Sequence, residues 1–491
     1  MILTAGNVWT YLDGDLTKIG VLDYVTSYRV HGRWFAKAYR KGHWDGITRF
    51  REFDRRKQRY RFPTGFLERV TAALDEKGVY YELIDERIFV TEDPVFELRA
   101  PDLPTGRLEL RDYQRDALER MLLYGRGTVK LPTGAGKTEV AAAAIKSLGR
   151  RSLFLTHRRT LLHQTQKRLT DRLGCRVGIL GDSQCDLQNV TVGMVQTLAK
   201  RKENVDVASW LSGVEVLVGD EVHHLEADQW YETFAAIDAP FRFGMTATPC
   251  TDGAGMRIIA MTGGIIAEVG IQTLIQQGVL VPPRIWFIKI TGPRLPKSAP
   301  YATVYKRGVT DNIQRNEMVV HAGQTFAAEE KPAITLVKRL KHGRSLVEQF
   351  QYKKVDCAFI HGKVKESDRL HLLDDLWAGR LKHIVAMEPV MGEGVDIPEL
   401  RALINATGSR GGGSKTNDVE HQVGRGTIQI LGRGLRRAPG KTHFDYVDFS
   451  DQHHAFLAAA TKDRLSTLLS EGYADGSDVR FWRSYAEASV A

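Results

Sequence analysis

"GTVKLPTGAGKTEVAAAAIKSL", residues 127–148, is the stretch that decides the fold. A strand-like run leads into a glycine loop, LPTGAGKT (131–138), and an alanine-rich helix follows. Backbone N–H groups of such a loop and the N-terminus of its helix bind phosphate. Lys137 adds a positive charge for the β- and γ-phosphates, and Thr138 adds a hydroxyl for Mg²⁺. The strict pattern has Gly where this chain has Leu131, and a chance match on a surface loop is the alternative. The strand–loop–helix context favours a phosphate site.

Apolar segments of strand length alternate with helix-length segments through most of the chain. This βα repeat predicts parallel sheets, whose ligands bind at the carboxyl ends of the strands. The repeat occurs twice, on either side of the stretch 271–283, so the 491 residues are expected to hold two such sheets in tandem. The predicted strands are RSLFLTH (151–157), VEVLVGD (214–220) and FRFGMTATP (241–249) in the first series, and PAITLVKRL (332–340), VDCAFIHG (355–362), LKHIVAM (381–387) and LRALINAT (400–407) in the second.

The strand predicted at 214–220 ends on Asp220, Glu221 follows directly, and two histidines come shortly after. Nucleotide hydrolysis at a phosphate-binding loop needs one carboxylate on Mg²⁺ and a base near the attacking water. Asp220 is assigned to the metal and Glu221 to the water. Zinc is the alternative, but it requires histidines one helical turn apart with a third ligand, whereas His223 and His224 are adjacent. We expect His223 to bond to a coupling segment, and His224 to be structural or solvent-facing.

The bulk composition narrows the class of protein. A formal net charge of +10 and a pI of about 9.3 favour a polyanionic partner, although simple solubility is the alternative. Four cysteines, none of them in a CxxC pair, favour a reducing compartment over a zinc or disulfide framework. No apolar run approaches the roughly 18 residues of a membrane span, and the N-terminus lacks a signal pattern. We therefore expect a cytoplasmic protein with no membrane partner.

Several further segments resemble a known family. PTGAGKT, DEVHH, MTATP, GEGVDIP and QILGRGLRR occur in this order and resemble motifs I, II, III, V and VI of the superfamily 2 helicases and translocases. The resemblance covers about residues 107–450 and implies an α/β fold. Two RecA-like parallel-sheet domains in tandem would bind ATP and Mg²⁺ between them, beside a small α+β N-terminal nucleic-acid-binding domain. LRDYQRDAL (110–118) resembles the adenine-reading element, in which Gln114 contacts the base.

The resemblance assigns roles residue by residue. Catalysis is assigned to Lys137, Asp220, Glu221, Gln429, Arg433 and Arg436, ATP binding to Gln114, Thr133, Gly134, Ala135, Gly136, Lys137, Thr138, Gly394 and Asp396, and Mg²⁺ binding to Thr138 and Asp220. Coupling is assigned to His223, Thr246 and Thr248, and nucleic-acid contacts to Arg158, Gln196, Thr197, His361 and Gly362. Arg433 and Arg436 are three residues apart, so we expect them on one helix face, within reach of the γ-phosphate.

The N-terminal region is basic and aromatic. Residues 39–70 resemble the N-terminal domain of the phage UvsW-type helicases, which remodel Holliday junctions, forks and R-loops. Basic residues interleaved with aromatics suit backbone contact and base stacking. A small domain with its own aromatic core and a solvated basic face is the alternative. We expect aromatics, including Trp44, mainly inside and arginines mainly on DNA, with Arg40, Lys41, Arg55 and Arg56 as contacts.

The predicted domains are an N-terminal basic DNA-binding domain (1–100), a first RecA-like domain with the P-loop and DEVH box (101–282), a second RecA-like domain with motifs IV to VI (283–455) and a C-terminal helical tail (456–491). The stretch 409–426, SRGGGSKTNDVEHQVGRG, is either a disordered insertion or a DNA-contacting loop.

The predicted function is an ATP-dependent DNA helicase or translocase in recombination, repair and replication. It would act as a monomer on branched, forked or single-stranded DNA, and on RNA in R-loops, in the cytoplasm of a bacterial or phage-infected host cell. Because phosphates would hold the strand, we expect little base specificity and strong salt dependence. An RNA helicase and the motor subunit of a restriction system are alternatives. A scaffold with a dead ATPase is a third, disfavoured by the intact Lys137, Asp220 and Glu221.

Overall fold

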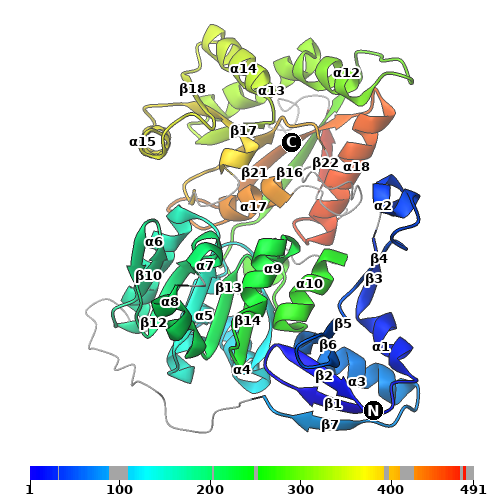
Figure 1. The fold of residues 1–491 in the computed structure, drawn as a ribbon. Helices are drawn as coiled ribbons and strands as arrows, with labels where there is room; N and C mark the ends of the chain where they lie inside the picture. Colours follow the sequence, from blue (N-terminus) through cyan, green and yellow to red (C-terminus); the bar gives the residue numbers. More distant parts are fainter. Residues whose placement is uncertain are drawn as a thin grey trace. The chain divides into compact units, whose positions relative to one another are not determined.

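The computed structural model describes residues 1–30, 32–87, 109–201, 204–247, 253–391, 397–409, 425–475 and 479–482 (Figure 1). Of these, residues 1–132 and 136–269 form one compact unit, and residues 133–135 with those from 270 onward form a second. The predicted boundary between the N-terminal and first RecA-like domains, at residues 100 and 101, and most of the glycine-rich stretch 409–426 lie outside the described residues. Among the described residues, no helix is long and apolar enough to cross a membrane.

The N-terminal part of the first unit is a small mixed domain. Its main sheet has the order β5-β6-β2-β1-β7, antiparallel except for the β1–β7 pair, and β3 and β4 form a separate antiparallel ribbon. Figure 1 shows this ribbon leading away from the main sheet toward α2. The elements are β1 (Ile2–Ala5), β2 (Trp9–Asp13), α1 (Ile19–Val25), β3 (Ser27–Arg29), η1 (Arg33–Phe35), α2 (Lys37–Arg40), β4 (Ile47–Arg49), β5 (Glu52–Asp54), β6 (Arg59–Pro63), η2 (Thr64–Phe66), α3 (Leu67–Glu76) and β7 (Glu82–Asp85).

The rest of the first unit is the predicted parallel sheet, with the order β11-β10-β12-β9-β13-β14-β8-β15, in which only β11 runs antiparallel. All three strands predicted in this part are confirmed, each with slightly shorter bounds. The elements are α4 (Asp112–Tyr124), β8 (Arg126–Lys130), α5 (Lys137–Leu148), β9 (Ser152–Thr156), α6 (Arg159–Leu173), β10 (Gly178–Gly181), β11 (Gln184–Asp186), β12 (Val190–Met194), α7 (Val195–Arg201), α8 (Val205–Ser212), β13 (Val216–Asp220), η3 (Val222–Glu226), α9 (Asp228–Ala235), β14 (Phe241–Thr246), α10 (Gly253–Thr262) and β15 (Ile265–Glu268).

The N-terminal domain shares a hydrophobic core with this parallel sheet. One cluster of buried side chains runs from Phe62 and Phe66 to Trp230 and Ile258. At its centre η2 lies directly on α10. A Cβ atom added to Gly65 would fall 1.8 Å from the carbonyl oxygen of Ile259, so only glycine allows this approach of the two backbones. The N-terminal domain is therefore a fixed part of the first unit.

The second unit contains a seven-stranded sheet with the order β18-β19-β17-β20-β21-β16-β22, in which all neighbours are parallel. The four strands predicted here are confirmed, whereas β22 lies in a tail that we predicted as helical only. The elements are α11 (Ile271–Gln276), β16 (Pro283–Ile290), α12 (Tyr301–Tyr305), η4 (Lys306–Thr310), α13 (Ile313–Ala328), β17 (Ala333–Val337), α14 (Leu340–Tyr352), β18 (Cys357–Ile360), α15 (Glu366–Trp377), β19 (His383–Met387), α16 (Glu388–Met391), β20 (Ala402–Asn405), α17 (Arg425–Gly434), β21 (Phe444–Asp451), α18 (Ala455–Ser470) and β22 (Val479–Trp482).

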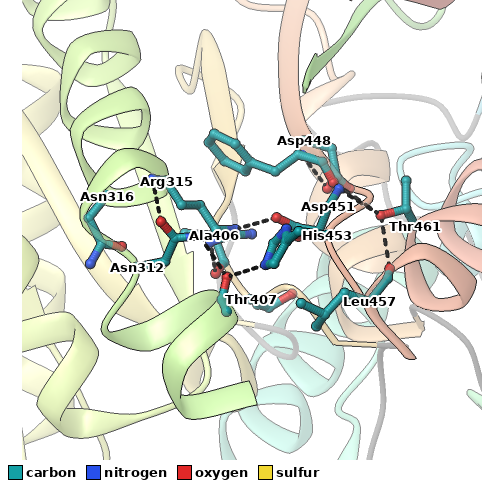
Figure 2. A network of polar contacts seen from close by, with 12 residues as sticks. Asn312, Arg315, Asn316, Ala406, Thr407, Asp448, Asp451, His453, Leu457 and Thr461 are labelled. Atoms are coloured by element: carbon teal, nitrogen blue, oxygen red, sulfur yellow. Dashed lines mark hydrogen bonds and ion pairs between the residues drawn. The ribbon is translucent and has the colours of Figure 1, made fainter. Parts of the chain in front are cut away.

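A buried polar network lies at the carboxyl ends of β20 and β21 (Figure 2). The Nε atom of Arg315 on α13 donates to Asp451 at 3.0 Å, and its Nη1 atom donates to the carbonyl of Ala406 at 2.9 Å. Arg464 on α18 donates to both carboxylate oxygens of Asp448, at 3.1 and 3.0 Å. All four charged side chains are almost inaccessible to solvent. The acids at this edge of the second sheet are thus neutralised by buried arginines of the same unit.

Candidate ATP-hydrolysis and nucleic-acid site

The glycine loop lies between β8 and α5, as the strand–loop–helix pattern predicted. Gly134 and Gly136 have φ angles of 88° and 83°, in the left-handed region that favours glycine. Gly136 is the N-cap of α5, so the loop feeds directly into the positive end of that helix. A Cβ atom on Gly136 would lie 2.4 Å from Nε2 of Gln114. The predicted adenine-reading residue therefore lies against the phosphate loop, where it is buried.

The two acids lie at the carboxyl end of β13, where Asp220 is the last strand residue. Glu221 follows with a φ of 52°, a left-handed conformation that is uncommon for a residue with a side chain and is concentrated at functional sites. Its Oε1 atom is 3.5 Å from Nζ of Lys137, and both side chains are largely buried. The structure thus brings the predicted lysine and the predicted base together.

The electrostatics around Asp220 fit a divalent cation. Burial, reinforced by the negative charge of Glu221, raises the pKa of Asp220 to about 6, while Lys137 opposes the rise. A cation would relieve this repulsion between two adjacent buried carboxylates. Among the described residues, no group of three or more His, Cys, Asp or Glu side chains is placed to hold a metal ion. Mg²⁺ does not need such a cage, because it keeps several waters and binds through one or two carboxylates and phosphate oxygens.

The predicted coupling residues lie beside this cluster. β14 pairs with β8 so that Thr246 is opposite Lys130, and the backbone N–H of Leu131 donates to the carbonyl of Thr246 at 3.0 Å. Motif III thus begins next to the glycine loop. His223 is buried with its Nδ1 atom 3.3 Å from Oε2 of Glu221, so its ring faces the predicted base. Thr248 lies outside the described residues.

A row of imidazole rings extends from the base toward the predicted nucleic-acid contacts. The ring centroids of His223 and His224 are 4.3 Å apart, and those of His224 and His157 are 4.2 Å apart. The amide of Gln196 then donates to the carbonyl of His157 at 3.1 Å. His157 was not singled out from the sequence, although its position at the end of a predicted strand was the available signal. This row provides a contact path between Glu221 and the strand-contacting segments.

The predicted nucleic-acid contacts of the first unit gather at one edge of its sheet. Arg158 is the N-cap of α6, immediately after β9, while Gln196 and Thr197 begin α7, immediately after β12. Because β9 and β12 are parallel neighbours, these side chains share the carboxyl edge. In the second unit, His361 and Gly362 follow β18, and a Cβ atom on Gly362 would meet nothing within 4 Å. That loop is open to solvent.

Motif VI lies on α17 of the second unit and just beyond it. Gln429 is buried within the helix, and Nη1 of Arg433 donates to the carbonyl of Met391 at 3.4 Å. The prediction that Arg433 and Arg436 share one helix face is wrong. The helix ends at Gly434, and the backbone of Arg436 instead forms an antiparallel bridge with Leu280. Two further predicted ATP-binding residues, Gly394 and Asp396, lie outside the described residues.

In the basic stretch of the N-terminal domain, most aromatic side chains are buried or half-buried, as predicted, and the basic side chains divide into paired and exposed ones. Three of its arginines pair with acids of the same domain, through the bridges Arg51–Asp23, Arg59–Asp13 and Arg61–Asp54. Three of its aromatics are exposed, with exposed fractions of 45% for Trp34, 59% for Phe35 and 45% for Phe53. The basic side chains Arg40, Lys41, Arg55 and Arg56 are exposed. Trp44 is half-buried and donates from Nε1 to the carbonyl of Ile47 at 2.9 Å.

Comparison with known proteins matches both parallel-sheet regions to helicase families. Residues 107–251 match the family described as "Type III restriction enzyme, res subunit", and residues 320–437 match "Helicase conserved C-terminal domain". The chain belongs to the superfamily 2 helicases. The two helicase domains of this superfamily 2 helicase imply ATP hydrolysis.

Curated relatives of this superfamily 2 helicase are named as DNA enzymes. It is 32% identical over 180 residues to the DNA 3'-5' translocase XPB2 of Sulfurisphaera tokodaii, covering 37% of this chain and 40% of that protein. It is 23% identical over 442 residues to the ATP-dependent DNA helicase uvsW of Enterobacteria phage T4, covering 85% and 83%. The chain spans 64% and 40% of the length of the first two curated relatives that it matches.

A solved structure supports the fold of this superfamily 2 helicase. The ATP-dependent Type ISP restriction-modification enzyme LlaBIII bound to DNA matches with a TM-score of 0.56 and 14% identity. The match covers 84% of this chain and 34% of that enzyme. Together with the two family matches, it confirms the predicted mixed α/β class with two helicase domains in tandem.

Proposed function

We propose that this chain is an ATP-dependent DNA helicase or translocase that remodels branched DNA in recombination, repair and replication. The observation that carries the proposal is the cluster of Lys137, Asp220 and Glu221 at the carboxyl ends of β8 and β13. A loop lysine next to two strand-end carboxylates suits phosphoryl transfer from ATP to water. The exposed basic side chains of the N-terminal domain support a polyanionic substrate.

Each residue of the cluster has a distinct task in hydrolysis. Lys137 would hold the β- and γ-phosphates, and Thr138 and Asp220 would hold Mg²⁺, which neutralises charge on the phosphates when bound. Glu221 would orient the attacking water and accept its proton. We assign Arg433 and Arg436 to the charge that develops on the γ-phosphate, a contribution worth roughly a thousand-fold or more in rate.

The step from hydrolysis to movement uses the contacts around Glu221. The row His223, His224 and His157 links the base to Gln196, so a change at the γ-phosphate is transmitted to the strand-contacting edge. DNA would be held mainly through its phosphates, which predicts weak base preference and a steep loss of affinity with salt.

The names of the relatives sharpen the proposal. Because XPB2 is named a 3'-5' translocase, we take movement in the 3'-to-5' direction as the expectation for this chain. UvsW is named an ATP-dependent DNA helicase, and it is matched over most of both chains. This match supports DNA as the substrate. Forks and four-way junctions are proposed from the resemblance of residues 39–70 to the UvsW-type helicases. We propose that the chain acts as a monomer, in the cytoplasm of a bacterial or phage-infected cell.

The test is ATP hydrolysis measured at one salt concentration without nucleic acid and with single-stranded DNA, duplex DNA, a four-way junction or RNA. We expect the strongest stimulation with branched DNA, together with conversion of the junction into forked products. Glu221→Gln is the control, because it should stop turnover while ATP and DNA still bind. Stimulation by RNA alone would overturn the DNA proposal.

A further variant tests the nucleic-acid contacts. Deleting residues 1–100 would uncover the shared core around Ile258, so charge reversal is the sharper experiment. Arg40→Glu combined with Lys41→Glu should weaken junction binding and flatten its salt dependence. Lys353→Glu combined with Lys354→Glu, an equally exposed adjacent pair, is the matched control. Equal effects of the two reversals would remove Arg40 and Lys41 from the contacts.

The motor of a restriction system is a second candidate, favoured by the family match over residues 107–251. Such a motor would move along intact duplex without separating the strands. Displacement of a third strand from a DNA triplex, with no loss of the duplex beneath it, would favour this candidate over the helicase.

A further inference from the structure

The segment that joins β3 to β4 carries two exposed aromatic side chains at its far end. This segment, residues 32–46, is called the aromatic arm and consists of η1, α2 and the turn that returns to β4. Trp34 and Phe35 lie side by side on η1, with ring centroids 6.1 Å apart. Their exposed fractions of 45% and 59% are high for such large apolar side chains. Among the described residues, neither ring belongs to the buried cluster that the N-terminal domain shares with the parallel sheet.

The rest of the arm holds these rings in place. The guanidinium of Arg33 lies 5.2 Å from the ring centroid of Trp34 and 5.6 Å from that of Tyr39. A Cβ atom on Gly46, whose φ is 79°, would fall 2.1 Å from Cδ of Arg33. The ring of Tyr39 also meets the edge of Trp44 at 6.4 Å. The arm therefore has a small packed centre of its own, which presents the first two aromatics outward.

The charge around the rings identifies the kind of partner. Lys37, Arg40 and Lys41 are exposed on α2 and at its end. The acid of the arm, Asp45, is already engaged by Arg49 at 2.6 Å. Flat apolar rings surrounded by cations suit unpaired bases, whose faces stack while their phosphates take the charge. An apolar protein partner would not need this ring of cations.

The base of the arm is fixed to the first helicase domain. Tyr28 of β3 packs on the start of α10, where a Cβ atom on Gly253 would fall 2.0 Å from the Tyr28 ring. The ring of Tyr28 also meets Phe50, which in turn meets Tyr231 of α9. Because α10 begins shortly after the strand that ends in Thr246, the arm is anchored next to motif III. It must move with that domain.

We propose that the aromatic arm is the strand-separating element of this helicase. Trp34 and Phe35 stack on the bases at the end of a duplex, at the point where single strand meets double strand. The base of the arm is packed on the first helicase domain, so ATP-driven movement along one strand would press the duplex end against the two rings. This inference rests on the proposed function for its ATP-driven movement.

The test compares strand separation with hydrolysis in the full chain. Trp34→Ala combined with Phe35→Ala should lower the unwinding rate on a forked duplex about tenfold, because base stacking is lost. Hydrolysis stimulated by single-stranded DNA should stay within about twofold of the parent value, because the ATP cluster is untouched. Trp34→Tyr combined with Phe35→Tyr keeps flat rings and should restore most of the unwinding.

The matched control is Tyr24→Ala combined with Tyr80→Ala, which removes two exposed rings of the same domain, 85% and 86% exposed, outside the arm. This control should unwind at the parent rate. A 2-aminopurine base placed at the fork gives an independent readout, since its fluorescence should change on binding of the parent protein and not of the alanine variant.

The outcomes separate the two proposals. If the parent protein shows no DNA-stimulated hydrolysis, the proposed function fails. If the parent hydrolyses and unwinds, but the alanine variant unwinds equally well, the arm is not the separating element. If the alanine variant loses hydrolysis even without DNA, the rings act on the motor itself, and the inference is again overturned.

Discussion

The two parallel sheets place acids at the same edge and use them in opposite ways. At the carboxyl edge of the first sheet, Asp220 and Glu221 adjoin each other, and Lys137 is the nearby cation. At the carboxyl edge of the second, Asp451 is paired with Arg315 of α13 (Figure 2). Asp448 is paired with Arg464 of α18. The first edge keeps an excess of negative charge for a ligand, whereas the second neutralises its charge internally.

The pKa values express the same difference. Burial and Glu221 raise the pKa of Asp220 to about 6, so its ionised form is unfavourable in the fold alone. Burial would lower the pKa of Arg464, but the charge of Asp448 outweighs it and raises that pKa above its usual range. Under the proposed function, the first edge gives up stability for catalysis, whereas the second edge retains it.

Asp220→Asn should give the largest effect. We expect turnover to fall roughly a thousand-fold or more, equivalent to about 4 kcal/mol of transition-state stabilisation, because the variant loses the carboxylate that we propose binds Mg²⁺. The free energy of unfolding without nucleotide should be unchanged or slightly higher, since repulsion from Glu221 is removed. Single-turnover hydrolysis and denaturant unfolding measure the two quantities. A clear loss of stability would show that the first edge is also a structural network.

Arg464→Met, unlike Asp220→Asn, should have its main effect on stability. The variant leaves Asp448 buried without its cation, and breaking such a pair costs about 3–5 kcal/mol of unfolding free energy. Asp448 would still accept hydrogen bonds from the hydroxyl of Tyr446 at 2.8 Å and from the amide of Asn405 at 2.9 Å. These two bonds should reduce the loss of stability. Denaturant unfolding of the parent, Arg464→Met, Asp448→Asn and the double variant forms a double-mutant cycle. Additive losses in that cycle would mean that the two side chains do not stabilise each other.

Acid should weaken the second unit through two buried histidines. Burial lowers the pKa of His342 and of His383 to about 3, from an ordinary 6.5. Both are neutral in the fold, while the unfolded chain binds protons below about pH 6.5. The free energy of unfolding is therefore not reduced by these histidines above about pH 6.5. It falls as the pH drops toward 3, by about 1.4 kcal/mol per pH unit for each histidine.

Hydrogen exchange in β17 and β19 between pH 7 and 5 measures this loss, after correction for intrinsic exchange. His342→Gln keeps a donor for Asn316, which His342 contacts through Nε2 at 2.9 Å, and should reduce the pH dependence by about half. His321→Gln, at an exposed position of the same unit, is the control and should leave the slope unchanged. An unaltered slope in His342→Gln would show that His342 is not one of the titrating groups.

Local patterns predicted the strands and the position of the glycine loop well. Every strand expected from the two βα series is present, and Lys137 lies beside Glu221 as the motif implied. Sequence reasoning failed where a residue's environment comes from elsewhere in the chain. Arg436 leaves its helix to bridge Leu280, and Arg51 and Arg59 bind acids 28 and 46 residues away.

The sequence by itself determined the glycine loop that carries Lys137 and the strand end that carries Asp220 and Glu221. A strand, a glycine loop, a helix start and a strand-end acid pair are contiguous features, and their backbone geometry follows from the residues that form them. Only the tertiary structure decided that His157 meets His224, that Trp34 and Phe35 remain exposed, and that the N-terminal domain is fixed to α10. Burial and pairing depend on which distant side chains arrive at the same place, and a linear pattern does not contain that information.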